Sequence, residues 1–500
     1  MFRQALIRKQ GSLGVLGTHS SPVRRIATST SRHAFESCGH QDVMLGHPPM
    51  PPDSSSPPLS WSEPHRDTEI DFWRKIPQWK DVSSDQFLSW QWGIRHIIEA
   101  NTRKKDKFIE FLYAMVPYEL PRTHGLGGLQ SRDEFVGDVV SGMKKATMSI
   151  RVMPYLLSRI NWDDPVNDPI FKQFIPLGSV MVDDHPMVNM IDSLNERKDS
   201  PVDGLVHRYP DKALFLPTSV CPTYCTFCTR AYAVGADTEM IAKEPPRMSR
   251  KKMDSVFEYI ESQEGLHDIV VSGGDAFYIQ PEMLEEIGDR LIGTKNIERF
   301  RFATKGLAVA PHRFIDEKDP WTDTLIRVSD KARRAGKHLA LHTHFNHPNE
   351  ISWITEQASL RLVQSGVTIR NQSVLLRGVN DNVDTMLTLI KKLAKMAIQP
   401  YYIYQCDMVP KIEHRRTSLQ TLLDIESQIQ GAVAGFFIPK CIVDLPGGGG
   451  KRPASLYESY DRRTGISTFK QPVLKGKDRE DKVYKYYDPV DTLLPTQNPV

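Results

Sequence analysis

Residues 213–230 read ALFLPTSVCPTYCTFCTR, and this stretch indicates the fold class. An apolar run typical of a strand, ALFLPT, leads into three cysteines, Cys221, Cys225 and Cys228, in a CxxxCxxC spacing. Three thiols within eight residues, in a chain of 500 residues with six cysteines, do not form a disulfide framework. Thiolates bind soft metals, so the cluster of cysteines indicates a metal site in a reducing compartment.

An iron–sulfur cluster fits this spacing better than zinc does. Three cysteines on one short loop can hold three irons of a [4Fe–4S] cube and leave the fourth iron open to a small molecule. Structural zinc requires four closed ligands. The other cysteines, Cys38, Cys406 and Cys441, are remote in sequence and form no CxxC pair. We therefore predict a [4Fe–4S] cluster and no zinc, with a structural metal knuckle as the alternative.

The region around the cysteines alternates between strand-like and helix-like segments. The candidate strands are ALFLPT, DIVVSGGD, RFRFATKG, HLALHTHFN, VTIRNQSVLL, YYIYQCD and FFIPKCIVDL. Amphipathic segments such as PEMLEEIGDRLI and NVDTMLTLIKKLAKM separate them. Such alternation predicts a parallel sheet with outer helices, and six or seven units indicate an open or incomplete (β/α) barrel. Polar residues gather where the strands end, which is where the active site of such a barrel is built.

The rest of the chain divides by composition. Residues 1–35 are rich in Arg and Ser, lack acids and begin with an amphipathic segment, as expected of a mitochondrial presequence; a disordered basic tail is the alternative. Residues 36–67 contain a Pro/Ser-rich linker. Apolar residues at helical spacing predict an N-terminal helical region over 68–205, ahead of a catalytic barrel over 206–453. Residues 454–500 form a C-terminal extension, either exposed or an interface arm.

Composition argues against two classes of protein, membrane-spanning proteins and nucleic-acid-binding proteins. The hydrophobic fraction of 40% and charged fraction of 25% are those of an ordinary globular protein, and no apolar run is long enough to span a bilayer. The net charge of +3 becomes −3 without the six basic residues of the presequence. Those residues are Arg3, Arg8, Lys9, Arg24, Arg25 and Arg32. This balance gives no reason to expect nucleic-acid binding.

Two glycine-rich turns follow candidate strands. In Ser272-Gly273-Gly274-Asp275 the glycines permit close backbone approach, and the aspartate can accept from an ammonium. The stretch DLPGGGGK ends in Lys451 and fails the Walker pattern, because Leu445 and Arg452 stand where Gly and Ser or Thr are required. A lysine on such a turn can form a Schiff base with an aldehyde cofactor. Without other information, a flexible surface loop is the favoured interpretation of this stretch.

Three histidines, His342, His344 and His347, lie close together in sequence. The first two lie on one face of a strand, so a metal site is an alternative interpretation.

Seven motif blocks, in order over roughly residues 206–453, resemble those of lysine 2,3-aminomutase, a family of radical S-adenosylmethionine (SAM) enzymes. The blocks are HRYPDKALFL, CPTYCTFCTR, VVSGGD, HTHFNHPNEI, NQSVLLRGVND, YYIYQCD and DLPGGGGK. The resemblance implies an α/β fold with an incomplete (β/α)6-type radical SAM barrel. It also implies a [4Fe–4S] cluster, SAM and pyridoxal 5′-phosphate (PLP) as cofactors, and an isomerase that interconverts L-lysine and β-lysine by moving the amino group between C2 and C3.

The resemblance assigns cofactor roles residue by residue. Cys221, Cys225 and Cys228 match the cluster ligands, and Lys451 matches the lysine that holds PLP. The positions that match the PLP phosphate site are Arg208, Tyr209 and Lys212, the last of which is Arg in the family. The positions that match SAM contacts are Ser272, Gly273, Gly274, Asp275, His344 and Gln372. With this resemblance we expect His344 to contact SAM and no second metal to bind.

The resemblance also assigns the substrate site. Arg230 matches the arginine that binds the substrate carboxylate, and Asp407 and Asp444 match the aspartates that bind its side-chain ammonium. Two carboxylates repel an acidic side chain, so lysine is the first candidate, ahead of arginine and ornithine. The alternatives are another amino acid, a protein-bound lysine, or a non-catalytic iron–sulfur protein of this fold. We further expect a reducing electron donor, a homo-oligomer and a location in the mitochondrial matrix.

This sequence departs from the family pattern after Arg230. The family's basic run is replaced by Ala231-Tyr-Ala-Val, which can alter the SAM or substrate pocket. The cysteines that bind a structural zinc near the C-terminus of the clostridial enzyme are also missing.

Overall fold

The computed structural model describes residues 70–101, 103–122, 128–476 and 481–493. No residue before 70 is described, so the predicted presequence and the Pro/Ser-rich linker lie outside these ranges and stay predictions. In the described part of the chain, no helix combines the length and the apolar character that a bilayer span requires.

The centre of the structure is a nine-stranded sheet whose spatial order follows the sequence from β5 to β13. The seven strands β6 to β12 are parallel, whereas β5 and β13 pair antiparallel at the two edges. The strands are β5 Leu205–Val206, β6 Lys212–Phe215, β7 Asp268–Val271, β8 Arg299–Ala303, β9 His338–Thr343, β10 Thr368–Val374, β11 Gln399–Tyr404, β12 Lys440–Leu445 and β13 Gly450–Pro453. The two edge strands are not paired with each other, so the predicted incomplete barrel is confirmed.

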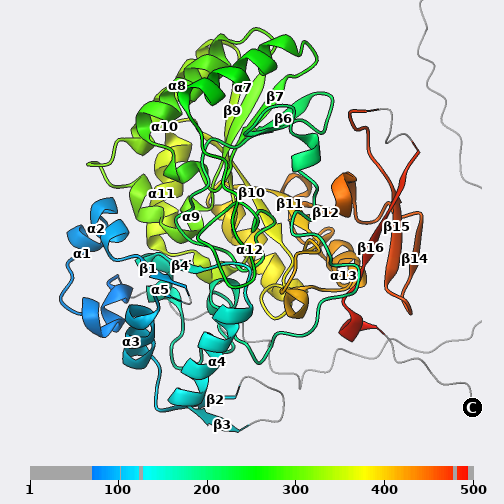
Figure 1. The fold of residues 1–500 in the computed structure, drawn as a ribbon. Coiled ribbons are helices and arrows are strands. Elements are labelled where there is room, and N and C mark those ends of the chain that lie inside the picture. Colours follow the sequence, from blue (N-terminus) through cyan, green and yellow to red (C-terminus); the bar gives the residue numbers. More distant parts are fainter. Residues whose placement is uncertain (1–69, 102, 123–127, 477–480, 494–500) are drawn as a thin grey trace, which may run out of the picture. The chain divides into compact units, whose positions relative to one another are not determined.

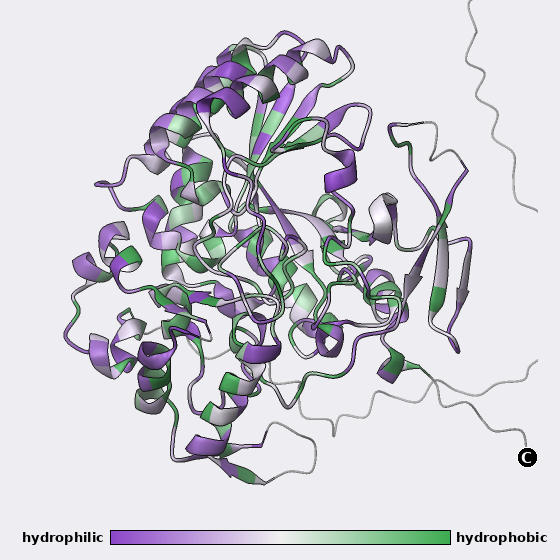
Figure 2. Ribbon diagram, in the orientation of Figure 1, coloured by the Kyte–Doolittle hydropathy of each residue, from purple (hydrophilic) through white to green (hydrophobic). Residues whose placement is uncertain are grey.

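Six long helices connect consecutive parallel strands. They are α7 Arg250–Ser262, α8 Pro281–Gly293, α10 Trp321–Arg334, α11 Trp353–Gln364, α12 Val383–Lys395 and α13 Leu419–Ile429. Each has one buried stripe; in α10, Leu325, Val328 and Ala332 recur at helical spacing and are fully buried. Figure 1 shows α7, α8 and α10 grouped beside the strands, and Figure 2 shows hydrophobic and hydrophilic residues alternating along these helices. Burial of these stripes against the sheet holds the helices on its outer face.

The region before the barrel is not wholly helical. Its helices are α1 Ser84–Phe87, α2 Trp90–Arg95, α3 Asp106–Met115, α4 Arg132–Lys145, α5 Pro154–Arg159 and α6 Phe171–Phe174. Two short antiparallel pairs also occur, β1 Ile98–Ala100 with β4 Ile150–Val152, and β2 Glu119–Pro121 with β3 Leu129–Ser131. Most of residues 175–204 has no regular structure, and this segment contributes to the site described below.

The C-terminal extension contains a three-stranded antiparallel sheet, β14 Ser459–Asp461, β15 Ile466–Lys470 and β16 Val483–Tyr487. It is drawn in orange and red in Figure 1. The Tyr486 hydroxyl donates to the carbonyl of Cys406 at 2.8 Å, just beyond β11. Asp488 accepts from the backbone N–H of Leu419, at the start of α13, at 2.8 Å. The extension therefore packs against the last two units of its own barrel.

Candidate active site

A cavity of about 370 Å³ lies at the sheet and brings together residues from most of its strands. Every site residue predicted from the sequence lines it, with the exception of Gly273. The predicted residues that line it are Arg208, Tyr209, Lys212, Cys221, Cys225, Cys228, Arg230, Ser272, Gly274, Asp275, His344, Gln372, Asp407, Asp444 and Lys451. Residues separated by more than 200 positions thus share one cavity.

The three cysteines lie on the loop between β6 and α7 and are half-buried. The backbone N–H of Tyr224 donates to the Arg151 carbonyl, and that of Thr226 to the Gln173 carbonyl, each at 3.0 Å. These bonds fix the loop against the N-terminal region. Burial raises the pKa of the Cys225 thiol to about 12, and nearby Lys305 opposes this rise.

The number of thiols in the cavity suits a cluster with one open iron. Within the described residues, no three His, Cys, Asp or Glu side chains converge as ligands of one metal ion. In a [4Fe–4S] cube each cysteine binds a different iron, so the three sulfurs need not converge on one point. Three thiols on one loop of the cavity are the number of ligands that a [4Fe–4S] cube with one open iron requires.

The glycine turn after β7 packs against the cysteine loop. Gly273 has φ +101°, and a Cβ there would lie 2.1 Å from the Thr218 carbonyl oxygen. A Cβ on Gly274 would lie 2.5 Å from the carbonyl oxygen of Val220. The backbone N–H of Gly274 donates to the Thr218 carbonyl at 2.6 Å. The glycines are thus required by contact between two protein loops, whichever ligand binds beside them.

Asp275 is held by the backbone. Its Oδ1 accepts from the N–H of Phe277 and its Oδ2 from the N–H of Lys305, both at 2.8 Å. Burial raises the pKa of this carboxyl to about 6, and these hydrogen bonds oppose the rise. The sequence predicts an ammonium as the partner of Asp275, and in the structure both of its carboxylate oxygens accept from backbone N–H groups.

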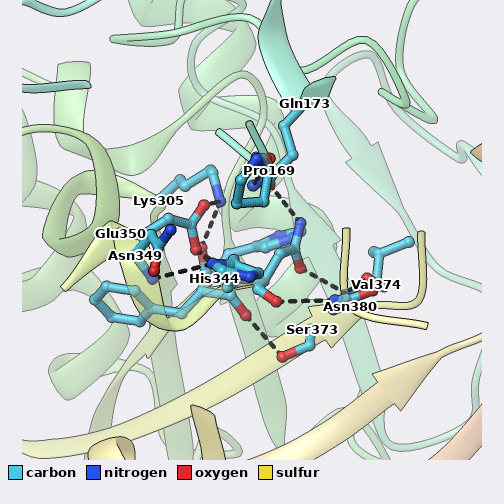
Figure 3. Close-up of polar contacts among 12 residues, drawn as sticks. Pro169, Gln173, Lys305, His344, Asn349, Glu350, Ser373, Val374 and Asn380 are labelled. Carbon is cyan, nitrogen blue, oxygen red and sulfur yellow. Dashed lines mark hydrogen bonds and ion pairs between the residues drawn. The ribbon is translucent and has the colours of Figure 1, made fainter. Parts of the chain in front are cut away.

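His344 belongs to a polar network that Figure 3 shows. Its Nε2 lies 3.1 Å from Oδ1 of Asn346, and its carbonyl accepts from Nζ of Lys305 at 2.7 Å. Lys305 also pairs with the fully buried Glu350 at 3.1 Å. Burial lowers the pKa of His344 well below its usual range. The imidazole is therefore neutral at ordinary pH and held at a fixed position on the cavity wall.

The other two histidines of this segment do not join His344. His342 packs against the ring of Tyr401 at 5.3 Å between centroids, and Nδ1 of His347 accepts from the backbone N–H of Asn349 at 3.1 Å. The three histidines thus have separate partners in the described residues.

Lys451 lies on β13, at one edge of the sheet, and its side chain is 32% exposed. Its backbone N–H donates to the Tyr209 hydroxyl at 2.8 Å, and Tyr209 follows β5 at the opposite edge. A Cβ on Gly449 would lie 2.6 Å from the Tyr484 ring, and one on Gly450 would lie 3.1 Å from the Tyr209 hydroxyl. The glycine stretch is therefore packed between the two edges and the C-terminal sheet, and the surface-loop interpretation is wrong.

Lys451 forms an ion pair with Asp444 on the neighbouring strand β12. Burial lowers the pKa of Lys451, but Asp444 and the Tyr404 hydroxyl outweigh it and hold this pKa well above its usual range. The Oδ1 atoms of Asp407 and Asp444 are both buried without a hydrogen-bond partner among the described residues. Burial, with the nearby Asp444, raises the pKa of Asp407 well above its usual range. The two carboxylates therefore form an incompletely satisfied acidic corner of the cavity.

The residues predicted at the PLP phosphate differ in their partners. Nε of Arg208 pairs with Asp199 at 2.6 Å, and this ion pair is buried, with exposed fractions of 6% and 7% for the two side chains. Nζ of Lys212 lies 4.2 Å from the centre of the Tyr209 ring. Both cations line the cavity. Two positive charges beside a phenol hydroxyl are suited to an anionic group such as a phosphate.

Sequence reasoning missed one carboxylate in the cavity. Glu196 pairs with Arg230 through two hydrogen bonds, Nε to Oε2 at 2.9 Å and Nη2 to Oε1 at 2.8 Å. Glu196 lies in the irregular segment before the barrel and outside all of the quoted motif blocks, so no local signal marked it. Lys305, Arg301 and Tyr404 also line the cavity and were not predicted.

Several proteins of known sequence are similar to this chain over most of its length. L-lysine 2,3-aminomutase of Clostridium subterminale is 34% identical over 410 residues, which cover 80% of this chain and 88% of that protein. L-lysine 2,3-aminomutase of Bacillus subtilis is 32% identical over 78% of this chain and 73% of that protein. Glutamate 2,3-aminomutase of Clostridioides difficile is 31% identical over 60% of this chain and 66% of that protein. The chain belongs to the lysine 2,3-aminomutase family.

No protein-family model matches the chain. Among solved structures, SuiB of Streptococcus suis bound to S-adenosylmethionine aligns with a TM-score of 0.33 and 9% identity, over 48% of this chain and 52% of that one. The family assignment depends on the sequence relatives, and the fold assignment on the sheet order and the connecting helices. Membership of this family implies a [4Fe–4S] cluster and SAM; the predicted loop of three cysteines is the part of the cavity that fits the cluster.

Proposed function

We propose that this protein is a lysine 2,3-aminomutase, which interconverts L-lysine and β-lysine with a [4Fe–4S] cluster, SAM and PLP. The observation that carries the proposal is one cavity lined by three cysteines, by Lys451 and by two under-satisfied aspartates. When bound, the cluster and SAM supply the radical chemistry, and PLP supplies the temporary covalent attachment of the migrating amino group. The chain itself supplies binding, orientation and exclusion of water.

The residues divide the cavity into regions. Cys221, Cys225 and Cys228 hold the cluster, and the loop after β7 together with His344 and Gln372 faces SAM. Lys451 holds PLP, while Arg208, Tyr209 and Lys212 bind its phosphate. Arg230 binds the α-carboxylate of the substrate, and Asp407 and Asp444 bind its terminal ammonium. The bonds that fix Asp275 and His344 to the backbone and to Asn346 support this division, because they hold the cavity wall rigid before ligands arrive.

Charge balance in the acidic corner favours a basic substrate. The ammonium of Lys451 neutralises Asp444. One ammonium balances only one of the two carboxylates in this corner. Asp407 and Asp444 then need another cation, because two adjacent carboxylates in a partly buried site are costly unless paired. The terminal ammonium of a free lysine meets that need, whereas the side-chain carboxylate of glutamate would add a third negative charge.

The experiment is an anaerobic assay of the purified protein. After reconstitution with iron, sulfide and PLP, we incubate it with SAM, a strong reductant and L-lysine, and we follow β-lysine by mass spectrometry. We expect β-lysine from the native protein and none from Cys225→Ala or Lys451→Ala. Cys441→Ala and Lys440→Ala are matched controls, because Cys441 is buried in the core away from the cavity and Lys440 is exposed at the start of β12.

The outcomes separate the alternatives. Cleavage of SAM without β-lysine would keep the radical SAM assignment and move the search to ornithine, arginine or a protein-bound lysine. A folded protein that assembles no cluster and cleaves no SAM would contradict the proposal and favour a non-catalytic role.

The mitochondrial location is a separate proposal, supported by the Arg- and Ser-rich, acid-free composition of residues 1–35. The bacterial relatives give it no support. Fusion of residues 1–35 to a fluorescent protein tests it: import into mitochondria supports the proposal, and diffuse fluorescence contradicts it. The electron donor and the homo-oligomer also stay proposals, to be tested by reduction assays and by measurement of the mass in solution.

A further inference from the structure

The carboxylate of Glu196 uses only one edge of the Arg230 guanidinium. It accepts from Nε and Nη2, which lie side by side on the lateral edge of the group. Glu196 makes no bond across the terminal edge, formed by Nη1 and Nη2, where the donors of a planar guanidinium can bind a second carboxylate. Nη1 lies 3.5 Å from the carbonyl oxygen of Gly273, in the turn that adjoins the cavity. Glu196 therefore fixes the plane of the guanidinium without blocking its terminal edge.

Glu196 is itself held in place. Its Oε2 also accepts from the Tyr232 hydroxyl at 3.0 Å, and its backbone N–H donates to Oδ1 of Asp192 at 3.0 Å. The Arg197 guanidinium lies 4.8 Å from the centre of the Tyr232 ring, and Tyr232 is buried. Tyr232 belongs to the Ala-Tyr-Ala-Val run that replaces the family's basic residues. The departure noted in the sequence thus provides the hydroxyl that orients Glu196.

The same segment touches the loop that carries Lys451. The backbone N–H of Gly447 donates to the Ser193 carbonyl at 2.8 Å, and a Cβ on Gly448 would lie 3.4 Å from the carbonyl oxygen of Leu194. Residues 193–196 therefore connect Arg230 with the glycine stretch before Lys451. The distance between the carboxylate-binding group and the cofactor lysine depends on this short segment.

We propose that Glu196, held by Tyr232, is a positioning residue that turns the terminal edge of Arg230 toward the α-carboxylate of the substrate. The inference rests on the proposed function, which assigns that carboxylate to Arg230. Glu196 does not contact the substrate; it acts through the guanidinium. Its isosteric replacement by glutamine keeps one acceptor oxygen but places an NH₂ donor against an N–H of Arg230, so the plane of the guanidinium is no longer fixed.

The test compares two ligands in the reconstituted, PLP-loaded enzyme. L-Lysine carries the carboxylate, and 1,5-diaminopentane is the same chain without it. The change in PLP absorbance on addition of each ligand gives its Kd. Hydrogen bonds to charged groups lead us to expect that Glu196→Gln weakens lysine binding by about 10- to 100-fold and changes diaminopentane binding by less than about twofold. Tyr232→Phe should give a smaller, lysine-specific loss of about three- to tenfold.

Glu285→Gln is the matched control. Glu285 on α8 pairs with Arg327 and Lys331 on α10, and none of these three residues lines the cavity. It should change neither affinity. Lysine binding by Glu196→Gln that is unchanged or tighter would overturn the inference, since Glu196 would then only shield the charge of Arg230. An equal loss for both ligands would also overturn it, because it would indicate a merely structural role.

Two further outcomes are distinguishable. If Glu196→Gln does not fold, Tyr232→Phe decides, and a lysine-specific loss supports the inference whereas no loss or an equal loss overturns it. If lysine produces no change in the native enzyme, the proposed function fails, and with it the assignment of Arg230 on which the inference depends.

Discussion

The contact between the glycine turn and the cysteine loop makes Gly273→Ala a severe substitution. The added Cβ would lie 2.1 Å from the carbonyl oxygen of Thr218 and 3.2 Å from its backbone nitrogen, both of which are backbone atoms that cannot rotate away. The residue also has φ +101°, which L side chains rarely adopt. A positive φ costs about 1–2 kcal/mol for alanine, and overpacking costs about 1–3 kcal/mol. We therefore expect a loss of about 2–5 kcal/mol in the free energy of unfolding.

The substitution should also separate the turn from the loop that carries the cysteines. Urea unfolding followed by tryptophan fluorescence measures the stability, and iron per chain after reconstitution measures the cluster site. Gly137→Ala is the control, because Gly137 lies on the exposed side of α4 with no atom within 4 Å of an added Cβ. Alanine there should be neutral or stabilise by up to about 1 kcal/mol. Native stability and full iron content in Gly273→Ala would refute the reasoning.

Three more predictions follow from buried polar groups. Burial lowers the pKa of His312 to about 4. Because the unfolded chain takes up the proton first, stability should fall by up to about 3 kcal/mol as the pH drops from 6.5 to 4, and urea titrations should show a flatter fall in His312→Leu. Asp407→Asn should lower kcat/KM for L-lysine by about 100-fold through loss of a buried charge partner, measured as β-lysine formation; an unchanged ratio would argue against the acidic corner as the ammonium site. Tyr486→Phe removes the bond to the Cys406 carbonyl and should cost about 1 kcal/mol in urea unfolding, whereas a loss below about 0.3 kcal/mol would show that this bond does not anchor the extension.

The barrel could be predicted from the sequence because each of its strands and helices has a pattern of its own along the chain. Each of β6 to β12 coincides with an apolar run that was visible without the structure, and the helices between them carry one buried stripe. When strands and helices alternate along the chain, a parallel sheet covered by helices is the arrangement that buries the apolar residues of both. The predicted cavity residues were found for a different reason, since they lie in motif blocks whose chemistry is specific: three thiols at one spacing, and a lysine after four glycines.

The N-terminal region and the C-terminal extension were less predictable. The strand pairs β1–β4 and β2–β3 are only three residues long in each strand, too short for a periodic signal. The extension reads as polar and charged, yet its Tyr484 and Tyr486 are buried against the barrel. Their burial depends on contact with residues 35 to 80 positions earlier, which no local pattern encodes.

By itself, the sequence determined the (β/α) order, the cysteine loop and the residue types that line the cavity. Only the tertiary structure decided which charges neutralise each other there. Arg230 pairs with Glu196 across 34 residues, and Lys305 pairs with Glu350 across 45 residues. Charge pairing acts through space over a few ångströms, whereas a sequence pattern records only which residues are neighbours along the chain.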